Sequence, residues 1–403
     1  MKHNILHLNF SKIGGAGLVA QTLNNYQSKL DNYESRFIYQ IESTINKSIL
    51  ANINTGLRAG IDNFVLKKYS SPSLYSYFRN REDIKYLELL KRHQGTIHLH
   101  WINGLLNSGS IQELINENKN LVWTMHDMET FTGGCHHSLN CNEFSNICDN
   151  CPILHAPFAF VARNQLTNKL RRLPHRSKIS YVFPSIWLKD KFAKSSFGSS
   201  ISGTVIPNPI DQVFFDAFQR EGFARKDKFV IGFIAQNLLD PFKQFELALR
   251  LINDVAGKVS KPIEIIAVGS LDLNKINTYN LNISHTNFIL TRDNMAKVYA
   301  KMDLLISTSQ AESFGLSIAE AGAVGIPSLV LGRSGSSELI SDSQTGFVVD
   351  SEQDFLLKLE LLINNESLLF KFHIEVNRYA KSNWHVDKVG IEYEKIYRES
   401  QSH

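Results

Sequence analysis

The chain has 403 residues, of which 43% are hydrophobic and 20% are charged, and its formal net charge is +4. This composition is typical of a folded globular protein and excludes a disordered or fibrous chain. The net charge is too small for the basic patch of a nucleic-acid-binding protein, so we expect no nucleic-acid partner. A single core is unusual at this length, and two domains of roughly 200 residues each are expected.

The expected location is the cytoplasm. The sequence has no apolar run of about 18 residues, the length that a helix needs to cross a bilayer. Residues 1–4 lead directly into a predicted strand rather than into the apolar segment of a signal peptide.

Glycines follow the first predicted strand, residues 4–9. The segment 11–17 contains Gly14 and Gly15 and precedes a predicted helix. Glycines at a strand-to-helix turn allow a ligand to approach the backbone closely. The spacing matches neither the dinucleotide fingerprint nor a P-loop, so on spacing alone a tight turn without a ligand is favoured.

Further predicted strands, 37–39, 96–101 and 121–125, alternate with helical stretches, which indicates an α/β protein with a doubly wound parallel sheet. His100 and the pair His126-Asp127 each lie near the end of a strand, on the side where such sheets bind ligands. A single histidine after a strand is more often a hydrogen-bonded loop residue than a catalyst. Because two such turns converge here, His126 is the first functional candidate of this half, with Asp127 as its orienting partner.

All four cysteines of the chain lie within 17 residues, at Cys135, Cys141, Cys148 and Cys151. The tight Cys148-x2-Cys151 pair has metal-ligand spacing, and a reducing cytoplasm disfavours two disulfides. Four thiolates would close the coordination of one structural zinc ion, although His136 or His137 could replace one of them. The alternative is that the four cysteines are only packed together.

Residues 155–178 are first apolar and then basic. A solvated basic helix is the favoured interpretation. The alternative is contact with an anionic membrane surface or with an anionic lipid-linked acceptor.

The second half repeats the strand-helix alternation, with predicted strands at 229–235, 263–269, 303–307, 326–331 and 345–350. Between the strands 303–307 and 326–331 lie a polar turn with Glu312 and a helix with Glu320, which we place about two turns into that helix. Free amides near Phe314, Gly315 and Leu316 form a predicted anion site. Two carboxylates flanking a helix N-terminus suit a ligand with hydroxyls and a diphosphate. The alternative, a capping Glu312 and a solvated Glu320, carries about equal weight on spacing alone.

Residues 309–327 read S-x-x-E-S-F-G-L-x-x-x-E-A-x-A-x-G-x-P, and residues 124–128 read T-x-H-D-M. The first string resembles the E-x7-E signature of retaining GT-B glycosyltransferases of family 4, and the second resembles the family segment whose histidine reaches the transferred sugar. The cysteine insert resembles one found in family members that build exopolysaccharides. The resemblance covers nearly the whole chain and is strongest at 302–350.

The resemblance implies two Rossmann-like domains facing a cleft. We expect an acceptor-side domain at 1–207, a donor domain at 208–382 and a C-terminal helix, 383–403, that crosses back to the first domain. The implied catalytic residues are His126, Asp127, Lys243 and Glu312. The implied donor-binding residues are Gly14, Gly15, Asn208, Phe314, Gly315, Leu316, Glu320 and Arg333. The family usually has a basic pair where this chain has Phe242-Lys243, and Arg333 is the candidate that compensates for the missing arginine, with a solvated loop arginine as the alternative.

The implied reaction transfers a hexose from a UDP- or GDP-sugar to a hydroxyl of a glycan or lipid-linked acceptor, with retention and without a catalytic metal. The expected role is synthesis of surface polysaccharide, capsule or lipopolysaccharide at the inner face of a bacterial membrane. One rival is a non-catalytic nucleotide-sugar-binding subunit of an active transferase. A nicotinamide dehydrogenase is disfavoured because the glycine fingerprint is absent.

Overall fold

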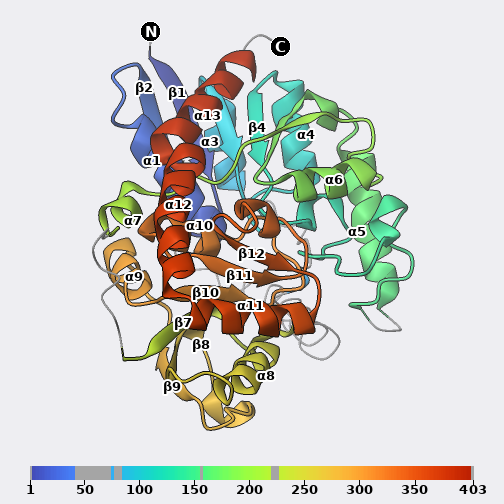
Figure 1. Ribbon diagram of the computed structural model, residues 1–403. Helices are drawn as coiled ribbons and strands as arrows, with labels where there is room; N and C mark the ends of the chain where they lie inside the picture. Colours follow the sequence, from blue (N-terminus) through green and yellow to red (C-terminus); the bar gives the residue numbers. More distant parts are fainter. Residues whose placement is uncertain (1, 41–73, 77–83, 155–157, 219–226, 401–403) are drawn as a thin grey trace, which may run out of the picture. The chain divides into compact units, whose positions relative to one another are not determined.

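The computed structural model describes residues 2–40, 74–76, 84–154, 158–218 and 227–400. The chain divides into two compact units (Figure 1). The first comprises Met1–Ile206 with Glu392–His403, and the second comprises Pro207–Ile391.

The first unit contains a six-stranded parallel sheet in the order β2-β1-β3-β4-β5-β6. Its strands are β1 (His3–Leu8), β2 (Tyr33–Ile38), β3 (Thr96–Leu99), β4 (Asn120–Thr124), β5 (Ser180–Phe183) and β6 (Gly203–Val205). The helices between them are α1 (Gly15–Gln27), α3 (Ile84–Arg92), α4 (Ser108–Asn116), α5 (Ala159–Arg172) and α6 (Ile186–Lys194), with short 3-10 turns at Glu129–Phe131, Glu143–Ser145 and Arg176–Lys178.

The second unit contains another six-stranded parallel sheet, in the order β12-β11-β10-β7-β8-β9. Its strands are β7 (Phe229–Asn237), β8 (Ile263–Ser270), β9 (Asn282–Thr286), β10 (Leu304–Ser307), β11 (Ser328–Leu331) and β12 (Gly346–Val349). Its helices are α7 (Gln212–Asp216), α8 (Phe245–Ala256), α9 (Arg292–Tyr299), α10 (Leu316–Val324), α11 (Glu352–Asn364) and α12 (Glu366–Trp384), and 3-10 turns occur at Pro241–Lys243, Leu273–Lys275 and Ser337–Leu339.

The last helix, α13 (Val386–Ser400), belongs to both units. Its residues up to Ile391 count with the second unit, and those from Glu392 onward count with the first. The boundaries expected from the sequence follow residues 207 and 382, whereas the two compact units divide after residues 206 and 391.

Each sheet has a point at which the order of its strands reverses. In the first unit β1 lies beside β3, and in the second unit β7 lies beside β10. Strands beside these reversal points, such as β10, are buried along their whole length, which explains their nearly continuous apolar sequence. Ligands of open parallel sheets bind beyond the carboxyl ends of the strands at such a reversal. The predicted α/β fold with two doubly wound parallel sheets is therefore confirmed.

The structure also bears on membrane insertion. Among the residues that it describes, no helix is both long and apolar enough to cross a bilayer.

Candidate functional site

Lys243 and Glu312 meet at the reversal point of the second sheet. Lys243 lies in the turn after β7 and Glu312 in the turn after β10, and the Lys243 Nζ donates to Glu312 Oε1. The side chains are 17% and 20% exposed, respectively, so that each keeps access to solvent. A cation and a carboxylate thus share one exposed edge of the sheet, where they can bind phosphate oxygens and hydroxyls, respectively.

Backbone hydrogen bonds fix the two turns relative to each other. The Gln310 amide donates to the Phe242 carbonyl at 2.8 Å, and the Thr308 hydroxyl donates to the Lys243 carbonyl at 3.0 Å. Phe242 itself is buried, and the Lys243 ammonium lies 4.8 Å from the centre of its ring. Phe242 therefore supports Lys243 by packing and by a cation–π contact.

The start of α10 follows Glu312 directly. Gly315 precedes the helix with φ of 95°, and a Cβ there would lie 2.8 Å from the Ser336 Cβ, so a larger residue would be strained as well as crowded. No side chain caps the helix, whose first residue is Leu316, whereas Phe314 is buried and anchors the turn. The amides of the first turn of α10 are therefore oriented as in an anion-binding helix N-terminus.

Glu320 lies on α10 but in a different environment from Glu312. It is the fifth residue of the helix, slightly more than one turn from the start, rather than two turns as the sequence analysis expects. The difference arises because Gly315 has a left-handed conformation and delays the start of the helix. Tyr299 donates a hydrogen bond of 2.9 Å to Glu320 Oε2. Burial is the largest effect on Glu320 and raises its pKa to about 7. The hydrogen bond from Tyr299 and the nearby Arg292 lower this pKa, whereas Asp211 raises it.

Two other predicted donor-binding residues of this unit lie elsewhere. Arg333 donates to Asp350 Oδ2 from Nε and Nη2 at 3.1 and 3.0 Å, and both side chains are more than half exposed. Asn208 is buried, and its Oδ1 makes no hydrogen bond with the residues that the structure describes. The structure thus brings Lys243 and Glu312 together, whereas Glu320 and Arg333 have separate partners.

In the first unit, His126 follows β4 and is bonded to another histidine. Its Nε2 lies 3.0 Å from the Nδ1 of His100, which follows β3. Asp127, which the sequence analysis assigns as the orienting partner of His126, has other contacts. It accepts hydrogen bonds from the Trp101 indole at 3.2 Å and from the Glu129 amide at 2.8 Å. Asp127 therefore anchors the turn, and His100 is the hydrogen-bond partner of His126.

The hydrogen-bonded chain of imidazoles continues from His100 to His7 on β1 and then to Gln27 on α1. His7 Nδ1 lies 3.1 Å from His100 Nε2, and His7 Nε2 lies 2.8 Å from Gln27 Oε1. His7, His98 and His100 lie close enough together to be considered as metal ligands. Among the described residues, they are the group of at least three candidate ligands whose ligand atoms all lie within 4.8 Å of one another. Sequence reasoning missed His7, His98 and Gln27. The alternation His98-x-His100 was the available signal, because residues i and i+2 of a strand share one face.

Gly14 and Gly15 form the start of α1. Gly14 has φ of 87°, which favours glycine, and no side chain caps the helix. A Cβ on either glycine would meet no described residue within 4 Å, whereas a Cβ on Gly17 would lie 2.4 Å from the Ser11 carbonyl oxygen. Space for a ligand therefore exists beside Gly14 and Gly15, and Gly17 serves close packing.

The four cysteines line one small cavity together with apolar residues that include Tyr75, Phe144 and Ile153. None is in a disulfide. Burial raises the pKa of Cys148 to about 11 and also raises the pKa values of Cys135 and Cys151. Within the described part of the chain, no three of these sulfurs meet the mutual spacing of 4.8 Å that the histidines satisfy. The sulfurs share a cavity but are not arranged as a closed four-coordinate site.

Helix α5 carries the basic stretch of the first unit, of which residues 155–157 lie outside the described part. Lys169 is not solvated, since it bonds Glu129 Oε1 at 2.8 Å with both side chains at most 5% exposed. It also donates to the Thr132 carbonyl at 3.1 Å. Lys169 therefore fixes α5 to the turn after His126, while Arg171 and Arg172 are exposed.

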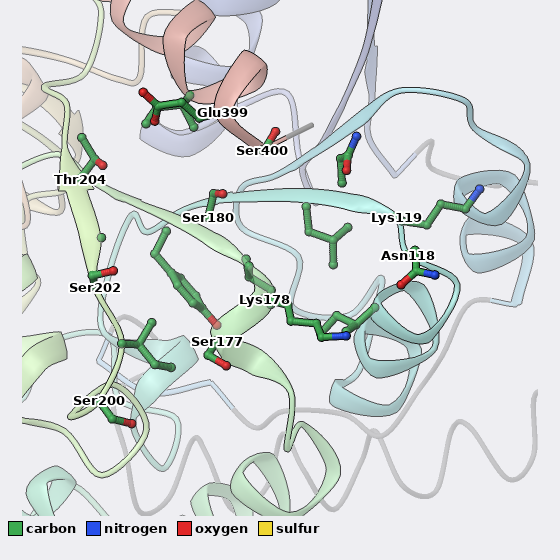
Figure 2. Close-up of a pocket in the computed structure, with 18 residues that line it drawn as sticks. Asn118, Lys119, Ser177, Lys178, Ser180, Ser200, Ser202, Thr204, Glu399 and Ser400 are labelled. Carbon is green, nitrogen blue, oxygen red and sulfur yellow. The ribbon is translucent and has the colours of Figure 1, made fainter. Parts of the chain in front are cut away.

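A larger pocket of the first unit lies away from these residues. Figure 2 shows its polar lining, which includes Lys119, Lys178, Ser180 and Thr204. These residues stand at or near the amino ends of β4, β5 and β6, whereas His126 follows the carboxyl end of β4. Because ligands of parallel sheets bind at carboxyl ends, we do not assign this pocket to the candidate site.

The comparisons with known proteins agree with this picture. Residues 214–382 match the family model "Glycosyl transferases group 1". An uncharacterized glycosyltransferase of Methanocaldococcus jannaschii is 24% identical over 308 residues, which are 74% of this chain and 81% of that protein. A protein named for colanic acid biosynthesis, the glycosyl transferase WcaC of Escherichia coli, is 24% identical over 283 residues, 67% of this chain and 66% of WcaC.

Two solved structures show the same fold. Sucrose-phosphate synthase from Thermosynechococcus elongatus is 12% identical with a TM-score of 0.69, and the match covers 100% of both chains. HepE from Anabaena, solved in complex with UDP and glucose, is 15% identical with a TM-score of 0.63, and the match covers 98% of this chain and 100% of HepE. The fold is thus that of these GT-B structures, and the family model, which matches residues 214–382, and the two relatives support a glycosyltransferase.

Proposed function

We propose that this chain transfers a hexose from a UDP- or GDP-sugar to a hydroxyl group of a glycan or lipid-linked acceptor, with retention of configuration. The observation that carries the proposal is the Lys243–Glu312 pair, which lies within the family-matched region at the carboxyl ends of β7 and β10. The complex of HepE with UDP and glucose supports a nucleotide-sugar as the donor class.

Each group of the second unit then has a chemical role. Lys243 and the amides at the start of α10, those of Gly315 and Leu316, would stabilise the diphosphate as it departs. Glu312 would accept hydrogen bonds from sugar hydroxyls, and Glu320 would accept them from the ribose. Retention in this chemistry requires no covalent carboxylate, because the leaving diphosphate can take the acceptor proton on the same face. Catalysis then depends on positioning and on electrostatic stabilisation.

The rival is a nucleotide-sugar-binding subunit without activity of its own. A panel of UDP- and GDP-sugars would first be tested for thermal stabilisation, since a ligand that binds only the folded protein raises its melting temperature. The stabilising donor would then be incubated with and without hydroxyl acceptors, and release of nucleotide would be measured. A transferase releases nucleotide slowly by itself and faster with an acceptor. Stabilisation without any release in the wild type would support the binding subunit instead.

The anomeric configuration of the product decides the stereochemical part of the proposal. NMR of the first product formed would show the same anomeric configuration as the donor. An inverted product would contradict retention while leaving glycosyl transfer intact. The relative named for colanic acid biosynthesis supports a role in surface polysaccharide synthesis, which we propose takes place in the cytoplasm at the inner face of the membrane.

We also propose that Cys135, Cys141, Cys148 and Cys151 hold a structural zinc ion. Their shared cavity and the absence of disulfides among them support it, and zinc binding would draw the sulfurs closer. Elemental analysis of protein purified without a metal-affinity column should give one zinc per chain, and the double variant Cys148→Ser/Cys151→Ser should lose it. Well under one zinc per chain with four titratable thiols would show that the cysteines are only packed.

A further inference from the structure

Four histidines of the first unit lie on one face of its sheet. His7 and His98 are register partners on β1 and β3, and His100 and His126 continue the same face beyond the ends of β3 and β4. The ring centres of His98 and His100 are 4.1 Å apart, and those of His100 and His126 are 5.3 Å apart. His7, His98 and His100 are buried and His126 is partly exposed. Four adjacent imidazoles in this position cannot all be charged, because desolvation and mutual repulsion both oppose protonation.

Their electrostatics agree with this expectation. Burial lowers the pKa of His7 to about 4 and that of His126 to about 3. Burial and the neighbouring histidines hold the pKa values of His98 and His100 well below the usual value. At neutral pH each ring therefore carries one N–H and one lone pair.

Every ring nitrogen of His7, His98 and His100 has a hydrogen-bond partner. His7 contacts Gln27 and His100, and His100 contacts His7 and His126. His98 contacts Tyr397 on α13 through Nδ1 at 2.9 Å and Thr124 through Nε2 at 2.8 Å. A metal ion bound by these three rings would have to replace at least two of these bonds, because His7 Nδ1 and His100 Nε2 share one bond. The arrangement is therefore a hydrogen-bonded chain rather than a prepared metal site.

The orientation of the Gln27 amide determines the direction of this chain. Its Oε1 can only accept, so His7 must donate from Nε2 and accept at Nδ1. His100 must then donate from Nε2 to His7 and accept at Nδ1, and His126 must donate from Nε2 to His100. The one remaining ring position of His126, Nδ1, is thereby left with a lone pair.

A second branch starts at the same amide. Gln27 Nε2 donates to the Tyr397 hydroxyl at 3.0 Å, and Tyr397 can then donate to His98 Nδ1. His98 donates from Nε2 to Thr124, whose hydroxyl lies 3.0 Å from that of Tyr393. One branch starts at the oxygen of the Gln27 amide and the other at its nitrogen. The hydrogen bonds of the network can therefore all point one way or all point the other way. Reversing one branch requires turning the amide, which also reverses the other branch.

We propose that Gln27, acting through His7 and His100, presents His126 with an unprotonated Nδ1, as a hydrogen-bond acceptor for a hydroxyl group of the bound sugar or acceptor. His126 is partly exposed at the carboxyl end of β4, where a ligand can reach it. Gln27, His7 and His100 are positioning residues in this proposal. The ligand class rests on the proposed function, whereas the state of the His126 ring does not.

The decisive measurement is the tautomer of His126 in the wild-type full-length chain. Long-range 1H–15N NMR with 15N-labelled histidine distinguishes the two neutral forms. We expect Nε2–H on His7, His98, His100 and His126 at pH 7.5. A proton on Nδ1 of His126 would overturn the proposal, and so would zinc bound with loss of these signals.

The Gln27→Leu variant tests whether the tautomer of His126 affects ligand binding. Gln27→Leu removes the root of both branches, so the His126 signals should become those of a mixture. Thr22→Val is the matched control, because Thr22 is buried on the same helix and donates to the Leu18 carbonyl, outside the network. We expect Gln27→Leu, but not Thr22→Val, to lower kcat/KM for the active donor about ten-fold, the loss expected for one neutral hydrogen bond.

Deoxy analogues of the donor and acceptor test whether His126 accepts a hydrogen bond from a ligand hydroxyl, separately from the protonation state of its ring. For the analogue that lacks the hydroxyl bound by His126, wild type and Gln27→Leu should have equal kcat/KM. A ten-fold difference with every analogue would contradict the proposed acceptor role. If no nucleotide-sugar is bound or consumed but His126 carries Nε2–H, the proposed function fails and the direction of the network stands.

Discussion

The two sheets present opposite kinds of chemistry at the carboxyl ends of their strands. In the first unit, neutral imidazoles are buried and bonded to one another, so that little beyond one acceptor atom is presented to a ligand. In the second unit, Lys243 and Glu312 are charged partners with access to solvent. Under the proposed function, a phosphate-bearing donor would need compensation of charge, which the second sheet offers, and an uncharged hydroxyl group would need directed hydrogen bonds, which the first sheet offers.

The histidine face should make the first unit sensitive to acid, which is the largest effect that we expect. The folded pKa values are depressed, so below about pH 6.5 the unfolded chain binds protons that the folded chain does not. The stability contributed by the neutral rings is present above pH 6.5 and lost as the pH falls toward 4. Each ring contributes about 1.4 kcal/mol per pH unit, and four rings contribute up to roughly 5 kcal/mol per pH unit.

Urea unfolding at pH 7, 6 and 5 would measure this loss, followed by the fluorescence of Trp101, Trp123 and Trp187 of the first unit. His7→Gln should reduce the slope by one ring. Replacement of the exposed His175 by glutamine should leave the slope unchanged. A flat profile between pH 7 and 5 would show that the histidine face admits protons without unfolding.

The charged pair of the second unit gives the next largest effect, this time on activity. Lys243→Ala should weaken donor binding ten-fold or more, because a charge-assisted hydrogen bond contributes about 1.5–3 kcal/mol. Glu312→Gln should lower turnover more than donor affinity. Steady-state kinetics and donor titration check both variants.

Arg333→Ala is the control for that experiment, and it also tests the compensation hypothesis. Its exposed ion pair with Asp350 predicts little change in stability and, if Arg333 is a solvated loop arginine, none in donor binding. Donor binding that depends on Arg333 as strongly as on Lys243 would instead assign it to the diphosphate. Wild-type kinetics for both Lys243→Ala and Glu312→Gln would remove the pair from the active site.

Much of the fold could be predicted from the sequence because the central strands are apolar. The apolar run 303–307 predicted β10, and the motif 309–327 predicted the turn after it and α10. The edge strands β6 and β9 were not predicted, since Gly203–Val205 and Asn282–Thr286 are short, polar and partly exposed. The edge strand β12 is apolar and was predicted at 345–350, so the missed strands are those whose polar, partly exposed residues give no apolar signal.

The candidate site could be proposed from the sequence where its residues lie in local motifs. Lys243 and Glu312 belong to two separate motifs, and the parallel-sheet topology brings their turns into contact. The chain from Gln27 to His126 was not predictable, because it depends on the register of β1 with β3 and on the position of α1. No sequence spacing specifies that His7 and His98 are partners.

Glu320 allows a smaller and more precise test. Its raised pKa of about 7 means that the folded chain holds a proton that the unfolded chain releases above about pH 4.5. The associated stability is present at low pH and lost as the pH rises through 7. Glu320→Gln should therefore stabilise the protein at pH 8 by about 1–2 kcal/mol, reduced by partial exposure, and change little at pH 5.

The same variant should weaken nucleotide binding at pH 8, because glutamine is a poorer acceptor for ribose hydroxyls than a carboxylate. Stability that rises while affinity falls is the pattern of a residue kept for binding. Equal stability at both pH values would contradict the raised pKa, and unchanged nucleotide affinity would remove Glu320 from the donor site.

The smallest expected effect concerns Gly15 at the start of α1. Gly15→Ala places a methyl group where no residue of the described ranges lies within 4 Å. Alanine favours a helix over glycine, so stability should stay equal or rise by up to about 0.5–1 kcal/mol. Gly17→Ala is the contrasting variant, since its Cβ would lie 2.4 Å from the Ser11 carbonyl oxygen and should destabilise the first unit. If a ligand approaches the backbone at Gly15, the added methyl group must occupy part of its space. We then expect a several-fold rise in KM for the donor or acceptor with kcat nearly unchanged, measured beside thermal unfolding of the same preparation. Wild-type kinetics in a fully stable Gly15→Ala would mean that the glycine pair only shapes the turn, and that His126 is left as the predicted ligand contact of the first unit.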